Sequence, residues 1–279
     1  MAEAGPRTEP RPSNCLRIIV TGSTRMKTPT TGSTLLALAL LATGCATDTT
    51  TCRYREVMTQ ISTYDALAAG LYDGVAPLTL LHGRGDLGLG TLHGWNGELI
   101  LLDGRYWLVD GDGAVSPITN MTAKTPFLAV TYFAEDMRRP LAAGTTFTDI
   151  KKSPGDYLPG VNVIYAIKLE GSFRHVKARS MPAQAKPYKV MAELVKTQPT
   201  FEFNEVAGTM IGFWTPASMQ GIGLAGWHLH FLTKDGKGGG HVLEFTTRDA
   251  ALKPDETLEV DWHISGLPDY KNAPLGTKP

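Results

Sequence analysis

Short apolar runs separated by Asn-Gly and Asp-Gly turns fill the sequence between Leu78 and Val130. Runs such as GELILL and RYWLV are rich in branched and aromatic residues, and WNGE, LDGR and DGDG lie between such runs. Asn-Gly and Asp-Gly favour tight hairpin turns because these residues adopt positive φ at little cost. The pattern therefore predicts a sheet built largely from antiparallel strands.

Two helices are expected beside these strands. After a predicted strand at residues 57–63, Ser62 with Asp65 fits a helix start and Gly74 a helix stop. In YKVMAELVKTQ, residues 188–198, apolar residues recur at helical spacing, and Pro199 would end this second helix.

The C-terminal half again shows mainly strand and turn patterns. VNVIYAIKLEGSFRHVKAR alternates in polarity and predicts two strands around Glu170-Gly171. The polar segment KKSPGDYLPG indicates a boundary between an N-terminal β-rich domain at 57–155 and a C-terminal metal-binding β-rich domain at 156–279. The expected fold class is α+β (mixed α/β), with two β-sheet-rich domains of mostly antiparallel or mixed strands and few helices.

The first 56 residues predict an export signal followed by a tether. Lys27 precedes a short apolar run and the small residues before Cys45, so residues 26–44 resemble a bacterial lipoprotein signal peptide. The apolar run is too short to span a bilayer. Cys45 would carry the lipid anchor and residues 45–56 would form the tether. Residues 1–25 fit neither role and suggest a misannotated or disordered extension before a true start at Met26. We therefore expect an exported cell-envelope lipoprotein that contacts the membrane only through its lipid.

Charge and cysteine content narrow the functional classes further. The chain carries 27 basic and 27 acidic residues, so its charge gives no reason to expect nucleic acid or an anionic membrane surface as a partner. Of its three cysteines, Cys45 is the predicted lipid site and Cys52 lies in the tether. This arrangement provides neither a disulfide framework nor a cysteine metal site.

Three of the seven histidines lie in GWHLHFLTKDGKGGGH, residues 226–241. His228 and His230 are two residues apart, so on a strand they project to the same side. KDGKGGG predicts a turn that brings His241, on the return strand, opposite this pair. Three neutral imidazoles leave coordination positions open, as in a catalytic metal site. The spacing alone selects neither zinc over iron, nickel or manganese nor a particular reaction.

The residues around this cluster resemble the acetolactate decarboxylase family. The similarity includes GLAGWHLHFLTKDGKGGGHV, KARSMPAQAKPY and GTLHGWNGELILLDGRYW, and it runs in family order from VMTQISTYDALAAGLYDG to LPDY. The resemblance implies a two-domain α/β fold, a homodimer, and a zinc lyase that converts 2-acetolactate to acetoin and carbon dioxide in acetoin biosynthesis.

The resemblance also implies roles for individual residues. The zinc ligands would be His228, His230 and His241; the catalytic residues Arg179 and Glu98; and the substrate-binding residues Thr91 and Arg179. Family members usually supply a second glutamate from a C-terminal tail, whereas this sequence stops four residues after Leu275. That role is left unassigned, with absence, Glu256, Glu259 or the partner subunit as the possibilities.

The chemistry of the implied reaction explains these residue types. Loss of carbon dioxide from 2-acetolactate sends electrons into the neighbouring ketone, and a metal would act as a Lewis acid that stabilises the resulting enediolate. Arg179 would hold the substrate carboxylate by a two-point contact, and Glu98 would deliver a proton as general acid. The alternatives are another three-histidine metalloenzyme, such as a dioxygenase or hydrolase, and a non-catalytic envelope metal-binding protein.

Overall fold

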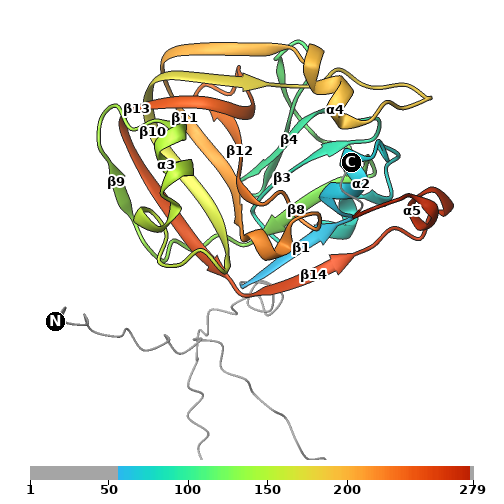
Figure 1. Cartoon of the computed structure of the whole chain (residues 1–279). Helices are drawn as coiled ribbons and strands as arrows, with labels where there is room; N and C mark the ends of the chain where they lie inside the picture. Colours follow the sequence, from blue (N-terminus) through green and yellow to red (C-terminus); the bar gives the residue numbers. More distant parts are fainter. Residues whose placement is uncertain (1–55, 277–279) are drawn as a thin grey trace, which may run out of the picture. The chain divides into compact units, whose positions relative to one another are not determined.

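The computed structural model describes residues 56–276, and every strand, helix and contact given below belongs to that part of the chain. Its first sheet has seven strands (Figure 1). All neighbouring pairs are antiparallel except β1 and β14, which are parallel. In spatial order the strands are β14 (Glu259–His263), β1 (Val57–Ile61), β8 (Phe127–Thr131), β3 (Leu87–Leu92), β4 (Asn96–Leu102), β5 (Arg105–Val109) and β6 (Val115–Pro117).

Consecutive hairpins build one half of this sheet, from β3 to the edge strand β6, as the turn pattern predicts. In the β4–β5 turn, Asp103 and Gly104 adopt φ of 50° and 75°, the positive values that a tight hairpin turn requires. The prediction of a largely antiparallel sheet is therefore confirmed.

The second sheet contains the four longest strands and curls on itself. β10 (Ile164–Arg179) pairs with both β11 (Thr200–Thr215) and β13 (Gly239–Thr257), and β12 (Gly226–Thr233) pairs with both β11 and β13. β9 (Arg139–Leu141) pairs with the outer side of β13. The result is a closed ring of pairings, seen on the left of Figure 1.

Three apolar clusters fill the space around the two sheets. One lies within the curled sheet and includes Phe173, Phe231 and Phe245. A second joins residues of both sheets, such as Leu89 of β3 and Phe213 of β11. The third covers the opposite face of the first sheet. Because the middle cluster packs the sheets face to face, side chains from both can meet at its edge, and the histidine site forms there.

The remaining elements are short. β2 (Ala76–Pro77) pairs with β7 (Lys124–Thr125). The α-helices are α2 (Tyr64–Ala68), α3 (Phe147–Lys152), α4 (Met191–Leu194) and α5 (Pro268–Asn272), and the 3-10 helices are η1 (Leu78–Leu81), η2 (Pro154–Asp156), η3 (Val195–Thr197) and η4 (Ala217–Met219). Across residues 56–276, no helix has both the length and the apolar character needed to cross a membrane. The α+β fold class is confirmed.

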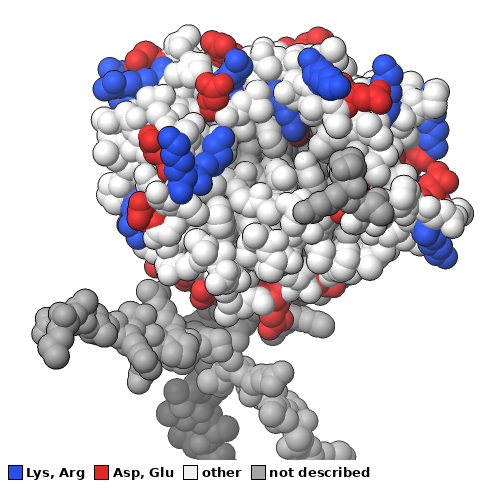
Figure 2. Space-filling model, viewed as in Figure 1, with Lys and Arg blue, Asp and Glu red and all other residues white. Residues whose placement is uncertain are grey.

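Charged side chains of both signs are interspersed on the face of the molecule drawn in Figure 2. This mixture agrees with the formal net charge of zero.

The predicted turn at Glu170-Gly171 is wrong, because β10 continues through it as one strand of 16 residues. A Cβ atom at Gly171 would lie 2.2 Å from the carbonyl oxygen of Asp249 on β13. The glycine therefore permits close approach of the neighbouring backbone, which is the other meaning of an isolated glycine in a strand.

Both predicted helices are shorter than expected. The cap of α2 is Thr63, whose hydroxyl accepts from the Ala66 amide, whereas Ser62 has a φ of 62° and lies outside the helix. The chain leaves α2 at Gly70, which has a φ of 90°, and not at Gly74. Within residues 188–198, only α4 and η3 are helical.

The predicted domain boundary between residues 155 and 156 nearly separates the strands of the first sheet from those of the second, with two exceptions. β9 precedes this boundary but belongs to the second sheet, and β14 follows it but belongs to the first. The two-domain division itself stays a prediction. The predicted extension, signal peptide and lipidated Cys45, and the predicted tether as far as residue 55, lie outside the described residues.

Candidate metal and active site

The hairpin of β12 and β13 brings the three histidines together, as their spacing predicts. His230 and His241 are direct partners in the β12–β13 register. Trp227 and Leu229 point into the core of the curled sheet, so His228 and His230 face the other way, toward the first sheet. The ring centroids are 5.0 to 5.4 Å apart, and one nitrogen of each ring lies within 4.8 Å of the others. This is a group that could hold a metal ion.

Burial keeps two of these imidazoles in the form that a metal requires. The pKa of His228 and that of His241 are both held well below the usual value of 6.5, mainly because burial disfavours the charged ring. The charge of Arg179 acts in the same direction, as would a positive charge on a neighbouring histidine. Both rings are therefore neutral near pH 7, with a lone pair available.

A backbone contact fixes which nitrogen of His230 is free. Its Nδ1 lies 2.9 Å from the carbonyl oxygen of Leu99, and because a carbonyl can only accept, Nδ1 carries the proton. In the neutral ring Nε2 is then an acceptor; it is buried without a hydrogen-bond partner and lies 3.2 Å from Glu98 Oε2. A ring lone pair facing a carboxylate oxygen is unfavourable unless a cation lies nearby. His241 Nδ1 is likewise buried without a partner. Both observations fit a bound metal cation, and a ligand histidine commonly donates its other nitrogen to a backbone carbonyl.

Arg179 and Glu98 meet beside the histidines. Arg179 pairs with His241 in the β10–β13 register, so Arg179, His241 and His230 form a row across three neighbouring strands. Glu98 comes from β4 of the other sheet, and its Oε1 accepts from Arg179 Nη1 at 2.7 Å. Both side chains are buried. The Arg179 guanidinium also lies 5.7 Å from the ring centroid of Trp95, which restricts its position.

The glycine run before His241 has a structural reason. Gly240 has a φ of 134°, and a Cβ atom there would lie 2.4 Å from the carbonyl oxygen of Arg179. Only a residue without a side chain allows β13 to approach β10 this closely. The same glycine thus sets the distance between His241 and Arg179.

The site opens into a cavity of about 550 Å³. All six site residues predicted from the sequence line it: Thr91, Glu98, Arg179, His228, His230 and His241. Thr91 lies in its wall, and its hydroxyl donates to the carbonyl oxygen of Gly97 at 2.7 Å. Neither Glu256 nor Glu259 lines the cavity; Glu256 pairs with Tyr165 on β10, and Glu259 lies on β14 at the edge of the first sheet.

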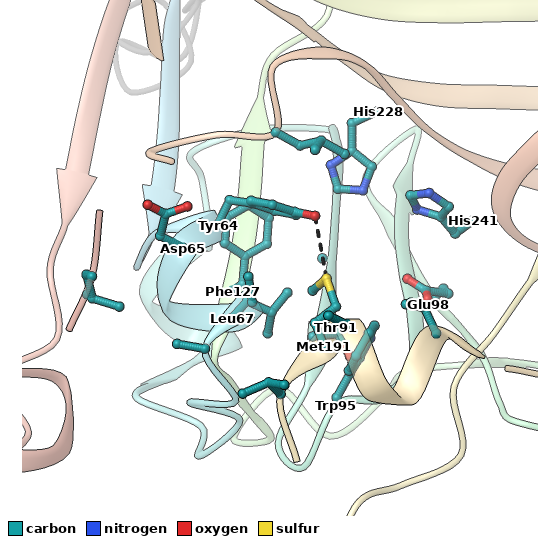
Figure 3. A pocket seen from close by; sticks show the side chains of 18 of the residues that line it. Tyr64, Asp65, Leu67, Thr91, Trp95, Glu98, Phe127, Met191, His228 and His241 are labelled. Carbon is teal, nitrogen blue, oxygen red and sulfur yellow. Dashed lines mark hydrogen bonds between the residues drawn. The ribbon is translucent and has the colours of Figure 1, made fainter. Parts of the chain in front are cut away.

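Several cavity residues were missed by the sequence analysis. They are mostly aromatic or apolar and include Val195 as well as Tyr64, Trp95, Phe127 and Met191, which are labelled in Figure 3. In the sequence such residues look like ordinary core positions of a strand or helix. For Tyr64 the sequence offers one signal, the predicted helix start after residue 62, because Tyr64 is the first residue of α2.

These features define a class of protein: a strand-rich fold with a three-histidine candidate metal site beside a buried arginine–glutamate pair. The chain also matches the family model described as alpha-acetolactate decarboxylase over residues 58–277. It belongs to the alpha-acetolactate decarboxylase family and is an enzyme of the carboxy-lyase class. The family resemblance stated from the sequence is confirmed.

Individual relatives agree with this assignment. An alpha-acetolactate decarboxylase of Methanosarcina mazei is 42% identical over 223 residues, covering 79% of this chain and 76% of the relative. One of Bacillus subtilis is 38% identical, covering 77% and 84%. The crystal structure of alpha-acetolactate decarboxylase from Bacillus subtilis strain 168 superposes with a TM-score of 0.75 at 37% identity, covering 79% of this chain and 94% of that one. The family therefore favours acetolactate decarboxylation over a dioxygenase, a hydrolase or a non-catalytic metal carrier.

Proposed function

We propose that this enzyme converts 2-acetolactate to acetoin and carbon dioxide with a zinc ion held by His228, His230 and His241. The observation that carries the proposal is the pair of buried nitrogens without partners, His230 Nε2 and His241 Nδ1, in a three-histidine cluster. Imidazole nitrogen is a preferred ligand of zinc, and three protein ligands suit a catalytic zinc site. When bound, zinc would supply Lewis acidity to the substrate oxygens as negative charge develops.

The chain's own residues would orient the substrate and move the proton. Arg179 presents a rigid guanidinium that can hold the substrate carboxylate and align the bond that breaks. Glu98, within reach of both Arg179 and His230, is placed to take up a proton from solvent and pass it to the carbon that loses carbon dioxide. Thr91 contributes to the cavity wall, and its hydroxyl donates its proton to the carbonyl oxygen of Gly97. The apolar remainder of the cavity excludes water, which strengthens these interactions.

Metal removal tests the proposal directly. Treatment of the purified protein with a strong chelator should reduce acetoin formation from racemic 2-acetolactate to background, and added Zn²⁺ should restore it. Dialysis of a parallel sample without chelator controls for loss of protein. Full turnover after thorough chelation would contradict the zinc mechanism, and restoration by Fe²⁺ with a requirement for oxygen would instead support a dioxygenase.

We infer that two copies of this chain associate through the free edge of β14. The backbone amide of Glu259 donates to the carbonyl oxygen of Glu56, and the carbonyl oxygen of His263 accepts from the amide of Ser62. The odd-numbered residues of β14 therefore direct their backbone hydrogen bonds toward β1. The even-numbered residues of β14 and the residues that flank it direct their backbone groups outward, and they are also exposed and apolar: Leu258, Val260, Trp262 and Ile264. An exposed apolar strand edge invites pairing with another strand.

The pattern on β14 is complementary to itself. In an antiparallel pairing about a two-fold axis at Trp262, Val260 lies opposite Ile264 of the partner subunit, and Asp261 lies opposite His263 of the partner subunit. Apolar side chains then meet apolar ones, and no like charges face each other. This complementarity supports a homodimer.

Light scattering during size-exclusion chromatography tests the interface. We expect a dimer for the unaltered protein and a shift toward monomer for Val260→Lys, because a charge would enter the apolar row. Val161→Lys, at a similarly exposed valine outside β14, should remain dimeric. A monomeric unaltered protein would contradict the dimer, and a dimeric Val260→Lys variant would contradict this interface.

Export and lipidation at Cys45 are a further proposal, supported by the signal-like pattern of residues 26–45. Mass analysis of the N-terminus of protein from the membrane fraction would identify a lipidated Cys45. A soluble protein that retains residues 26–44 would contradict the proposal.

A further inference from the structure

Tyr64 places a hydroxyl group in the cavity on the side of helix α2. Figure 3 shows its oxygen pointing into the cavity toward His228, while Glu98 lies on the other side. The position is well fixed, because the Tyr64 amide donates to the Ile222 carbonyl and the Asp65 amide to the Gly221 carbonyl, each at 2.9 Å. The Thr63 cap holds the same turn. A hydroxyl held by a rigid backbone is suited to recognising a ligand.

The hydrogen bond that Tyr64 makes within the described chain is weak. Its hydroxyl donates to the sulfur of Met191 at 3.5 Å, and a thioether is a poor acceptor. Two other donors of the cavity wall have better partners: Thr91 donates to a carbonyl at 2.7 Å and Arg179 to a carboxylate at 2.7 Å. A substrate oxygen would therefore displace the Met191 contact at little cost.

The hydroxyl also stays protonated. Burial raises the pKa of Tyr64 above its usual value of 10, and this effect exceeds the opposing effect of the Arg179 charge. Tyr64 is thus a neutral donor throughout the range in which a decarboxylase of this kind would work.

The substrate class offers an oxygen that needs such a donor. A 2-hydroxy-3-oxo acid presents a carboxylate, a hydroxyl and a ketone, and the ketone oxygen gains negative charge as carbon dioxide leaves. A hydrogen bond to that oxygen strengthens as the charge develops, so it stabilises the transition state more than the bound substrate. Glu98, which accepts a hydrogen bond from Arg179, lies on the other side of the cavity.

We propose that the Tyr64 hydroxyl leaves the Met191 sulfur and donates a hydrogen bond to the ketone oxygen of the bound 2-hydroxy-3-oxo acid. This inference rests on the proposed function. The bond involves no proton transfer, since the phenol keeps its proton while the oxygen that it contacts becomes negative.

Kinetics of Tyr64→Phe test the proposal, because this variant keeps the ring and removes only the hydroxyl. We expect kcat to fall about 10- to 100-fold, the range for a hydrogen bond to a charged group, with a smaller change in KM. Zinc affinity and melting temperature should stay close to those of the unaltered protein. Tyr188→Phe is the matched control, since Tyr188 is also half-buried and donates to a side chain, Asp73, but lies outside the cavity.

Met191→Leu separates substrate binding from a structural role. If the Tyr64–Met191 contact only held α4 in place, Met191→Leu would lose as much activity as Tyr64→Phe, and that result would overturn the proposal. So would a kcat within twofold of normal for Tyr64→Phe. If Tyr64→Phe fails to fold, a fluorinated tyrosine at position 64 can replace it, because this residue keeps the shape of tyrosine but its hydroxyl ionises at lower pH. We then expect kcat to fall as the pH rises and the hydroxyl loses its proton. A pH profile of kcat that matches the unaltered protein would contradict the proposal. Acetoin formation by the unaltered protein in the same assay tests the proposed function separately.

Discussion

Replacing His230 with alanine should abolish zinc binding and acetoin formation together, with kcat/KM falling more than about a hundredfold. A fall of 10- to 100-fold is typical when a group that merely supports a metal ligand is removed, and His230 is proposed as a ligand itself. It is the most buried of the three histidines, and its free Nε2 faces Glu98. No other side chain of the described cluster can take its place, because His228 and His241 already provide the remaining two nitrogens.

Two measurements check this expectation. Zinc affinity can be determined by competition with a chromogenic chelator, and the melting temperature can be recorded with and without Zn²⁺. Metal that binds only the folded state raises the stability of the unaltered protein, so the zinc-dependent shift should disappear in His230→Ala. His82→Ala, which removes an exposed histidine outside the cavity, should behave like the unaltered protein in both assays. If His230→Ala kept tight stoichiometric zinc, the assignment of the ligands would be wrong.

The contrast between the local and the distant parts of this site shows what the residue pattern could predict. The three histidines lie within one hairpin, so strand periodicity and a glycine-rich turn were enough to bring them together. The row from Arg179 to His241 depends on the register between β10 and β13, and that register includes irregularities that no local pattern reveals. Glu98 is 81 residues from Arg179 and approaches from the other sheet. Only the family resemblance identified these two residues in advance.

Glycine and aromatic residues account for most of the errors. The sequence pattern predicts a turn at Gly171, but this glycine lets two long strands approach closely. A glycine in a sequence can mark either a turn or a close approach of two backbones, and the local pattern does not distinguish them. Tyr64, Trp95 and Met191 were not considered as site residues, because aromatic and apolar side chains have the same appearance in a core and in a cavity wall. Only the folded arrangement shows that residues of α2 and α4 line the cavity.

Removing Arg179 should impair both catalysis and stability. In Arg179→Ala we expect kcat/KM to fall about 100- to 1000-fold, as when one preorganised donor to a developing charge is lost. Arg179→Lys keeps the charge but not the planar two-point contact, so its loss should be nearly as large. Glu98→Gln should reduce kcat about 100-fold or more if Glu98 transfers the proton. Steady-state kinetics with 2-acetolactate measure all three effects. Near-normal turnover of Arg179→Ala or of Glu98→Gln would contradict the role assigned to that residue.

The stability effect follows from burial of the pair. Glu98 is 4% exposed and Arg179 is 8% exposed, and their atoms meet at 2.7 Å. Arg179→Ala leaves the carboxylate buried without its partner, a change that typically costs about 3–5 kcal/mol of unfolding free energy. In metal-free protein the double variant Arg179→Ala/Glu98→Gln should recover a large part of that loss, because the unpaired charge is gone. Urea unfolding of the four proteins gives the coupling energy between the two side chains. If Arg179→Ala cost the same in the Glu98→Gln background, the destabilisation would come from lost packing against Trp95, and the ion pair would contribute little.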